Sequence, residues 1–149
     1  MSSISSLTDS LRALSVQLSL LNHQVGARLE LKDGDLYCLD VITRHGPLSP
    51  SAIARRAGLH PATMTGILDR LERGGWIVRE RDPQDRRAVR VAGRPDRGAE
   101  VFALYRPMIS SIDEICAGYT EAELALLTDF MDRVTAAGHT ATERLARPQ

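Results

Sequence analysis

The amino-acid sequence predicts a mainly helical protein of the α+β class, in which long helical ends flank a shorter middle region that carries two β-strands. Three observations indicate this fold. Apolar residues near both ends of the chain recur every three or four positions, which is the spacing of one helix face. Glycine and proline residues divide the middle into short segments. Two of these segments are rich in β-branched residues, which favour strands.

The first long helix is predicted over residues 4–29. Its apolar residues are Ile4, Leu7, Leu11, Leu14, Leu18, Leu21, Val25 and Leu29. Because three or four residues separate each from the next, they form one continuous stripe on a helix of about seven turns. Such a stripe has to be buried against another element.

Two more long helices are predicted towards the C-terminus. The first covers residues 98–116, and Pro107 within it removes a backbone hydrogen bond, so we expect a kink there. Thr120 and Glu123 form a capping box that opens the last helix, whose apolar stripe ends at Leu145.

The apolar stripes at both ends of the chain need a partner. A chain of 149 residues offers them little surface to bury against, so pairing with a second copy is the economical solution. We therefore assign residues 1–30 and 98–149 to a helical dimerisation region and residues 31–97 to a separate functional region, the two forming one domain overall. The alternative is a helical bundle formed within one chain.

The middle region predicts three short helices. Residues 33–44 form the first, which ends at Gly46. Ser49 caps the second, which begins at Pro50 and ends at Gly58. The side chains expected to face the core from the first and third helices are Leu36, Leu39, Val41 or Ile42, Met64, Ile67, Leu68 and Leu71.

The third helix and a following β-hairpin complete the middle region. The helix covers residues 60–73, and the strands cover residues 76–78 and 88–91. Ala54 supplies the small residue that the crossing of the second and third helices requires, and Gly58 tolerates a positive φ in the turn between them. Three helices followed by a hairpin form a winged helix-turn-helix.

The net charge of the chain is zero, but the charge is unevenly distributed. Residues 44–97 contain 12 arginines and six acidic residues, a net charge of +6, and the remainder of the chain carries −6. A local excess of positive charge attracts the phosphates of nucleic acid. We therefore expect the middle region to bind double-stranded DNA, with the acidic ends held away from the phosphates.

If the third helix lies in the major groove of DNA, its outward N-terminal residues face the bases. These recognition-helix candidates are Pro61, Ala62, Thr63, Thr65, Gly66 and Arg70. The candidates for phosphate contacts are Ser49, Ser51, Arg55, Arg56 and Arg73. The threonines and arginines are also consistent with an ordinary solvated helix surface.

The hairpin tip predicts a basic wing, where Arg86 and Arg87 are adjacent. A narrow minor groove concentrates negative potential and attracts an inserted arginine. Asp85 either holds Arg87 in position through an ion pair or only tightens the turn.

Together these motifs resemble the MarR (multiple antibiotic resistance regulator) family of winged-helix transcription factors. The resemblance is carried by Gly46–Ser49, Ile53–Leu59, Thr63–Thr65, Leu68–Gly75 and the wing segment Asp82–Ala88. It implies a sequence-specific regulator, acting as a repressor, that binds a near-palindromic operator as a homodimer, with Arg87 reading the minor groove. It also implies that a small anionic or phenolic effector relieves DNA binding from a cleft between the dimerisation helices and the winged helix.

Few polar residues suit such an effector cleft. The candidates are His23, Arg28 and Tyr37, although a lone histidine on a helix is also typical of ordinary surface. Cys38 and Cys116 lie on apolar segments and are expected to be inert core thiols. The four histidines show no helical pairing with one another or with cysteine, so neither a metal site nor a cofactor is expected.

Other classes of protein are less consistent with the sequence. The chain carries no nucleophile elbow, phosphate loop or zinc-protease motif, so we do not expect an enzyme. It has no basic leader followed by an apolar run and no apolar stretch near 18 residues, which favours a cytoplasmic protein without a membrane partner. The remaining alternative is a winged-helix module that binds other proteins without specific DNA binding.

Overall fold

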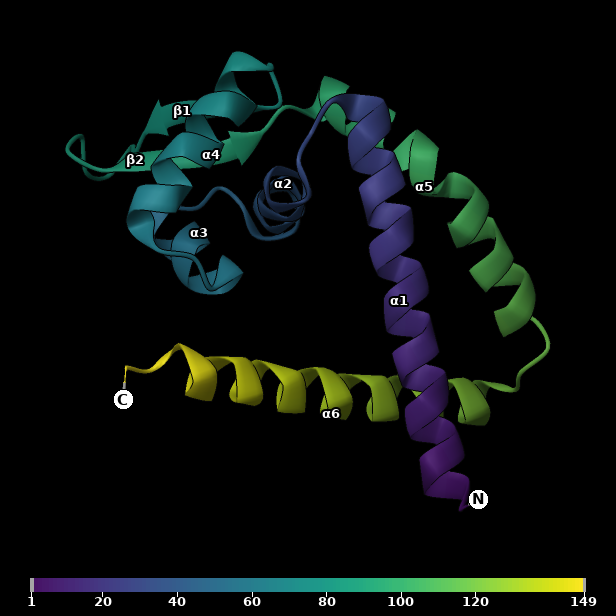
Figure 1. Cartoon of the computed structure of the whole chain (residues 1–149). Coiled ribbons are helices and arrows are strands. Elements are labelled where there is room, and N and C mark those ends of the chain that lie inside the picture. The colour runs from purple at the N-terminus through teal and green to yellow at the C-terminus, as the bar shows by residue number, and fades with distance from the viewer. Residues whose placement is uncertain (1, 149) are drawn as a thin grey trace.

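The computed structural model describes residues 2–148 and is mainly helical (Figure 1). Its elements in chain order are α1 (Ser3–Leu29), α2 (Asp33–His45), α3 (Pro50–Ala57), α4 (Pro61–Arg73), β1 (Ile77–Arg81), β2 (Val89–Gly93), α5 (Pro95–Cys116) and α6 (Glu121–Ala146). The predicted fold class is confirmed, and the order of the elements agrees with the sequence pattern.

The hydrophobic core lies in the middle of the chain, where α2, α3 and α4 pack beside the β1–β2 hairpin (Figure 1). Its buried residues are Cys38, Leu39, Val41, Ile42, Ile53, Ala54, Met64, Ile67, Leu68, Leu71, Trp76, Ile77 and Val91. The inward-facing residues predicted for α2 and α4 are confirmed, and both Val41 and Ile42 are buried. The winged helix therefore has a core of its own.

The two strands form an antiparallel hairpin, and a third segment joins its edge. Arg81 pairs with Val89 next to the wing. Leu48, just before α3, exchanges two backbone hydrogen bonds of 3.0 and 2.7 Å with Val91. β1 continues to Arg81, beyond its predicted end, because the ladder extends into charged residues that an apolar pattern does not mark. β2 continues to Gly93, which pairs with Ile77.

The helix boundaries agree closely with the predicted capping residues. Gly58 ends α3 with a φ of 66°, and Thr120 and Glu123 form the reciprocal capping box of α6. α5 begins at Pro95, before the predicted residue 98, because proline is favoured in the first turn of a helix. α5 also curves along its length in Figure 1, as expected from the proline in its interior.

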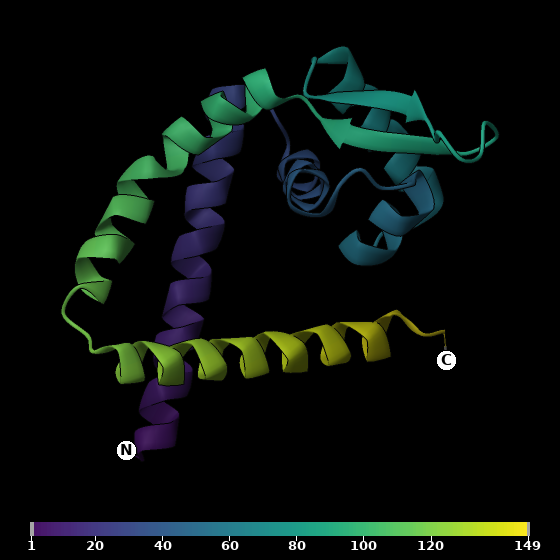
Figure 2. The same ribbon diagram turned by 180° about the vertical axis from the view of Figure 1, so that it is seen from behind.

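The three long helices leave their apolar sides uncovered in a single chain. No residue of α5 or α6 is buried, and α1 buries only Val25 and Gly26 near its C-terminal end. Exposed apolar residues of these helices include Ile4, Leu7, Leu14, Phe102, Ile112, Leu127, Met131 and Leu145. α6 extends from the end of α5 as a separate arm (Figures 1 and 2). A helical bundle within one chain, the alternative considered from the sequence, is therefore not what the structure shows.

Candidate nucleic-acid interface and effector cavity

The helix-turn-helix is built from α3 and α4. Ala54 of α3 is almost fully buried, so its small side chain lets the two helices approach closely. Gly58 turns the chain between them in the left-handed conformation. His60 then caps α4, and its Nδ1 accepts a hydrogen bond of 3.1 Å from the backbone N–H of Ala62.

The N-terminal part of α4 presents a largely exposed surface. Pro61, Ala62, Thr63 and Thr65 are exposed and Gly66 is half-buried, while the apolar residues of the helix face the core. The Thr65 hydroxyl donates a hydrogen bond of 3.1 Å to the carbonyl of Pro61, so it remains available only as an acceptor. This exposed turn has the placement that a recognition helix needs to meet base edges.

Arg70 has a structural role that was not expected. Its Nε and Nη2 atoms donate hydrogen bonds of 2.9 Å to both carboxylate oxygens of Asp35, which is only 3% exposed. These hydrogen bonds raise the pKa of the Arg70 guanidinium. The pair joins α2 to α4, so Arg70 holds the recognition helix in place through two of its nitrogens, and its contact with a base stays a prediction.

The residues predicted to contact phosphates lie at the start of α3, in its last turn and near the end of α4. The Ser49 hydroxyl accepts a hydrogen bond of 3.2 Å from the N–H of Ala52 and lies 3.2 Å from the Ser51 hydroxyl. Arg55 and Arg73 are exposed. The two serines therefore sit beside the free N–H groups of a helix start, a common position for an anion.

The wing is a tight turn with exposed arginines. Asp85 accepts a hydrogen bond of 3.0 Å from the backbone N–H of Arg87. No ion pair between their side chains is found in residues 2–148, so Asp85 tightens the turn and does not hold the Arg87 guanidinium. Arg86 and Arg87 are exposed and lie next to each other at the tip.

Eleven of the twelve arginines of the middle region fall into two groups, and the twelfth, Arg81, donates a hydrogen bond of 3.1 Å to the carbonyl of Arg86. Arg44, Arg70, Arg79, Arg94 and Arg97 form ion pairs with acidic residues. Within the described part of the chain, six arginines have neither an ion pair nor a side-chain hydrogen bond: Arg55, Arg56, Arg73, Arg86, Arg87 and Arg90. They lie on α3, at the end of α4, at the wing tip and on β2, and the wing tip is at the end of the molecule away from α1 and α5 (Figure 1). Arg90 was not singled out by the sequence motifs, because it stands alone on a strand.

A cavity of about 940 Å³ lies between the long helices and the winged helix. Its lining is mainly apolar and includes Leu18, Leu21, Leu36, Phe102, Ile109 and Ile112. Tyr37 lines it as expected, whereas His23 and Arg28 do not, so two of the three predicted polar residues were wrong. Helical spacing places these two residues on α1 but does not show which face of α1 the cavity meets.

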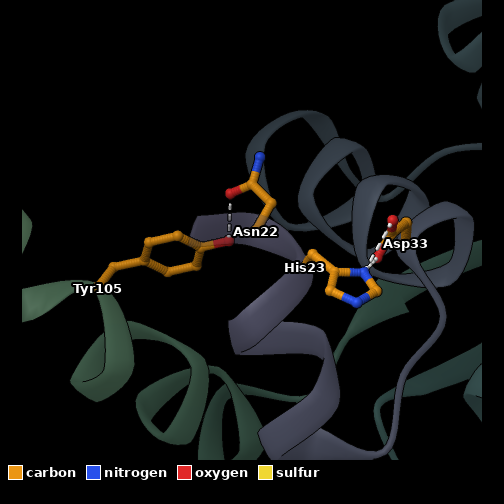
Figure 3. A network of polar contacts seen from close by, with 4 residues as sticks. All are labelled: Asn22, His23, Asp33 and Tyr105. Atoms are coloured by element: carbon orange, nitrogen blue, oxygen red, sulfur yellow. Dashed lines mark hydrogen bonds and ion pairs between the residues drawn. The ribbon is translucent and has the colours of Figure 1, made fainter. Parts of the chain in front are cut away.

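Polar contacts join α1 to α5 and to the start of α2 (Figure 3). The Tyr105 hydroxyl donates a hydrogen bond of 2.7 Å to Oδ1 of Asn22, which links α5 to α1. His23 lies beside them, and its Nδ1 is 3.0 Å from Oδ1 of Asp33 at the start of α2. Burial, followed by the charge of Asp40, raises the pKa of Tyr105. Sequence reasoning missed Asn22 and Tyr105 because Tyr105 falls on an apolar stripe.

The two cysteines lie in different environments. Cys38 is fully buried, and burial, with the charge of Asp35, raises the pKa of its thiol to about 11. A thiol with so high a pKa is unreactive at neutral pH, as predicted. Cys116 was also predicted to lie in the core, but in a single chain it is only half-buried on α5.

Neither a metal-binding cluster nor a membrane-spanning helix is found in the described residues. Residues 2–148 contain no group of three or more histidine, cysteine or acidic side chains placed to hold a metal ion. Among these same residues, no helix is both long and apolar enough to cross a bilayer.

Comparison with known proteins identifies the family. Residues 31–89 match the family model described as MarR family. The uncharacterized HTH-type transcriptional regulator YcgE of Bacillus subtilis is 33% identical to this chain over 128 residues, which cover 85% of this chain and 83% of YcgE. The chain belongs to the MarR family. The resemblance inferred from the sequence motifs is thereby confirmed, and this MarR-family chain is a transcriptional regulator.

Solved structures of MarR-family proteins share the fold over almost the whole chain. The crystal structure of MarR superposes with a TM-score of 0.59 at 25% identity, covering 89% of this chain and 96% of that chain. FabT of Streptococcus pneumoniae, solved in complex with DNA, superposes with a TM-score of 0.72 at 19% identity, covering 93% of this chain and 99% of FabT. The winged helix and the long helices are thus common features of these proteins.

The Arg70–Asp35 pair leads to a stability prediction. We expect Arg70→Gln to lower the free energy of unfolding by about 2 kcal/mol, because it leaves a buried carboxylate without its charged partner. Urea unfolding followed by circular dichroism measures this change. The matched control is Arg73→Gln on the same helix, which removes an exposed guanidinium and should change stability by less than about 0.5 kcal/mol. Equal losses in the two variants would contradict the structural role of Arg70.

Proposed function

We propose that this MarR-family regulator binds a near-palindromic DNA operator as a homodimer and represses transcription, and that a small ligand in the cavity relieves binding. The observation that carries the proposal is the exposed N-terminal turn of α4 together with six arginines, unpaired within residues 2–148, on α3, at the end of α4 and in the β1–β2 hairpin. Guanidinium groups without internal partners are available for phosphates.

The placement of these arginines agrees with a winged helix on duplex DNA. α4 would enter the major groove with Thr63 and Thr65 towards the base edges. Arg55 and Arg73 would contact phosphates on either side, together with Ser49 and Ser51. Arg87 at the wing tip would reach the adjacent minor groove, where negative potential is concentrated.

A homodimer explains the uncovered apolar sides of α1, α5 and α6. These helices carry large apolar residues with no partner in one chain, and a second copy offers a complementary apolar surface. A two-fold dimer would present two recognition helices to two half-sites, which is the reason to expect a near-palindromic operator. The DNA complexes solved for FabT and for a mutant of MepR from S. aureus support this mode of binding by analogy of fold.

Ligand control is proposed from the position of the cavity. The cavity lies between the long helices and the winged helix, so a bound ligand would change the angle between these two parts. A ligand that binds better to one spacing of the recognition helices than to another shifts the population between DNA-competent and DNA-incompetent forms. The effector class expected from the family is a small anionic or phenolic molecule, and the charged groups on the lining are the guanidinium groups of Arg44 and Arg94 and the carboxylates of Asp33 and Asp40.

Salt dependence distinguishes this proposal from a winged-helix module that binds proteins. An operator duplex is first selected from a random DNA pool, and its affinity is then measured at several salt concentrations. We expect a straight line of log affinity against log salt with a slope steeper than about −4, since each neutralised phosphate contributes about −0.9. A flat line, or no selectable duplex, would refute DNA binding.

The wing provides a test at the level of one residue. Arg87→Ala is expected to weaken operator binding by about 1–3 kcal/mol, because it removes the guanidinium proposed to enter the minor groove. Fluorescence anisotropy of the labelled operator measures this loss. Arg12→Ala, on the exposed N-terminal part of α1, is the control and should bind as the unmodified protein does. Unchanged affinity in Arg87→Ala would remove this residue from the interface.

The dimer is tested by two neighbouring leucines on α6. Leu127 lies on the apolar stripe, whereas Leu126 points about 100° away around the helix and is 69% exposed. Leu127→Glu should convert the dimer to monomer at micromolar concentration in sedimentation velocity and reduce operator affinity with it, because a charge would be buried at the interface. Leu126→Glu should remain dimeric. A dimer that survives the first substitution would contradict the proposed interface.

A further inference from the structure

Arg97, near the start of α5, joins three parts of the structure through one guanidinium group. Its carbon Cζ lies 3.8 Å from the centre of the Trp76 ring, which is a cation–π distance. Its Nη1 donates a hydrogen bond of 3.2 Å to the carbonyl of Gly74, the residue that ends α4. It also forms an ion pair with Glu100 on the next turn of α5.

Trp76 is at the same time part of the cavity wall. Only 4% of the residue is exposed, and it is the single tryptophan of the chain. Its backbone N–H donates a hydrogen bond of 2.9 Å to Leu71 in α4, and its carbonyl accepts one of 3.0 Å from Arg94 at the start of α5. Trp76 therefore borders the cavity and also contacts the Arg97 guanidinium.

The Trp76 ring lies close to the end of α4. A methyl group built on Gly74 would lie 2.8 Å from the Cδ1 atom of Trp76, so the end of α4 is in direct contact with the indole. Gly75 follows with a φ of 76°, which only glycine adopts easily. The Arg97 guanidinium makes the bonded connection here, because it is stacked on the ring and donates a hydrogen bond to Gly74.

We propose that Arg97 is the positioning residue that couples the cavity to the recognition helix. An occupant of the cavity displaces the Trp76 ring, and Arg97, which is stacked on that ring and bonded to Gly74, carries the displacement to the end of α4. This inference rests on the ligand control described under Proposed function. It adds the physical connection through which a ligand in the cavity changes the affinity of α4 for DNA.

The coupling is measured with a generic probe, 8-anilinonaphthalene-1-sulfonate, which is anionic, aromatic and fluorescent in apolar sites. The coupling factor is the operator dissociation constant with saturating probe divided by that without it. We expect a factor of at least about 5 for the unmodified protein, the lower end of typical allosteric coupling. Excitation of Trp76 should sensitise the probe, which provides a spectroscopic signature of occupancy next to the indole.

The variants isolate the contribution of Arg97. Arg97→Gln should keep operator binding in the absence of probe within about threefold, while its coupling factor falls to about 1, because the cation–π contact is lost. Arg97→Lys should restore most of the factor, since an ammonium group retains that contact.

Arg79→Gln is the matched control. Arg79 also connects the hairpin to α4, through Asp69 and Glu72, but it does not contact Trp76. Its factor should stay at the unmodified value.

One further variant establishes that the probe occupies the cavity. Gly98 lines the cavity, and a side chain built there meets no atom within 4 Å. Gly98→Met should therefore weaken probe binding by partly filling the space. If it does not, the probe lies elsewhere, and the claim that filling this cavity acts on α4 is overturned.

The outcomes separate this inference from the proposal on which it rests. If the unmodified protein binds operator but shows a coupling factor of 1, ligand control and the coupling role of Arg97 both fail. If the unmodified protein is coupled and Arg97→Gln keeps its full factor, ligand control stands and the role of Arg97 alone is refuted. A factor lost in Arg97→Gln, restored in Arg97→Lys and retained in Arg79→Gln supports the inference.

Discussion

The apolar sides of α1, α5 and α6 stay largely exposed in one chain, and the proposed assembly follows from this exposure. The core residues all lie between Cys38 and Val91, so the winged helix folds around a core of its own. The long helices are left with exposed leucine, isoleucine and phenylalanine side chains. In the proposed dimer, a second copy covers these faces, and its two-fold axis sets the distance between two winged helices.

The electrostatic organisation follows the same division of the chain. The middle region carries an excess of positive charge and the helical ends an excess of negative charge. A count of charges does not distinguish one arginine from another, but the structure shows which arginines form ion pairs and which do not. Arg70 and Arg79 stabilise the position of α4 through ion pairs, whereas Arg55 and Arg87 are exposed and unpaired within the described residues. Only the second kind is free to meet phosphates.

The differences between expectation and structure have a common cause. Helical periodicity shows which side of a helix is apolar, but it does not show which element lies opposite. Arg70 was therefore assigned only to DNA, although its partner, Asp35, lies 35 residues earlier on α2. His23 was assigned to the cavity, although it lies outside the lining, and Tyr105 was counted as an apolar residue although its hydroxyl is bonded to Asn22.

The sequence by itself determined the order of the elements, most of their caps, the buried faces of α2 and α4, and the family. These features depend on interactions within a few residues along the chain, such as the capping box at Thr120 and the left-handed turn at Gly58, so local patterns are enough to predict them. Only the tertiary structure decided which arginines are free, where the cavity lies, and that Arg97 stacks on Trp76. Those features depend on contacts between distant residues, and packing around a common core sets their geometry.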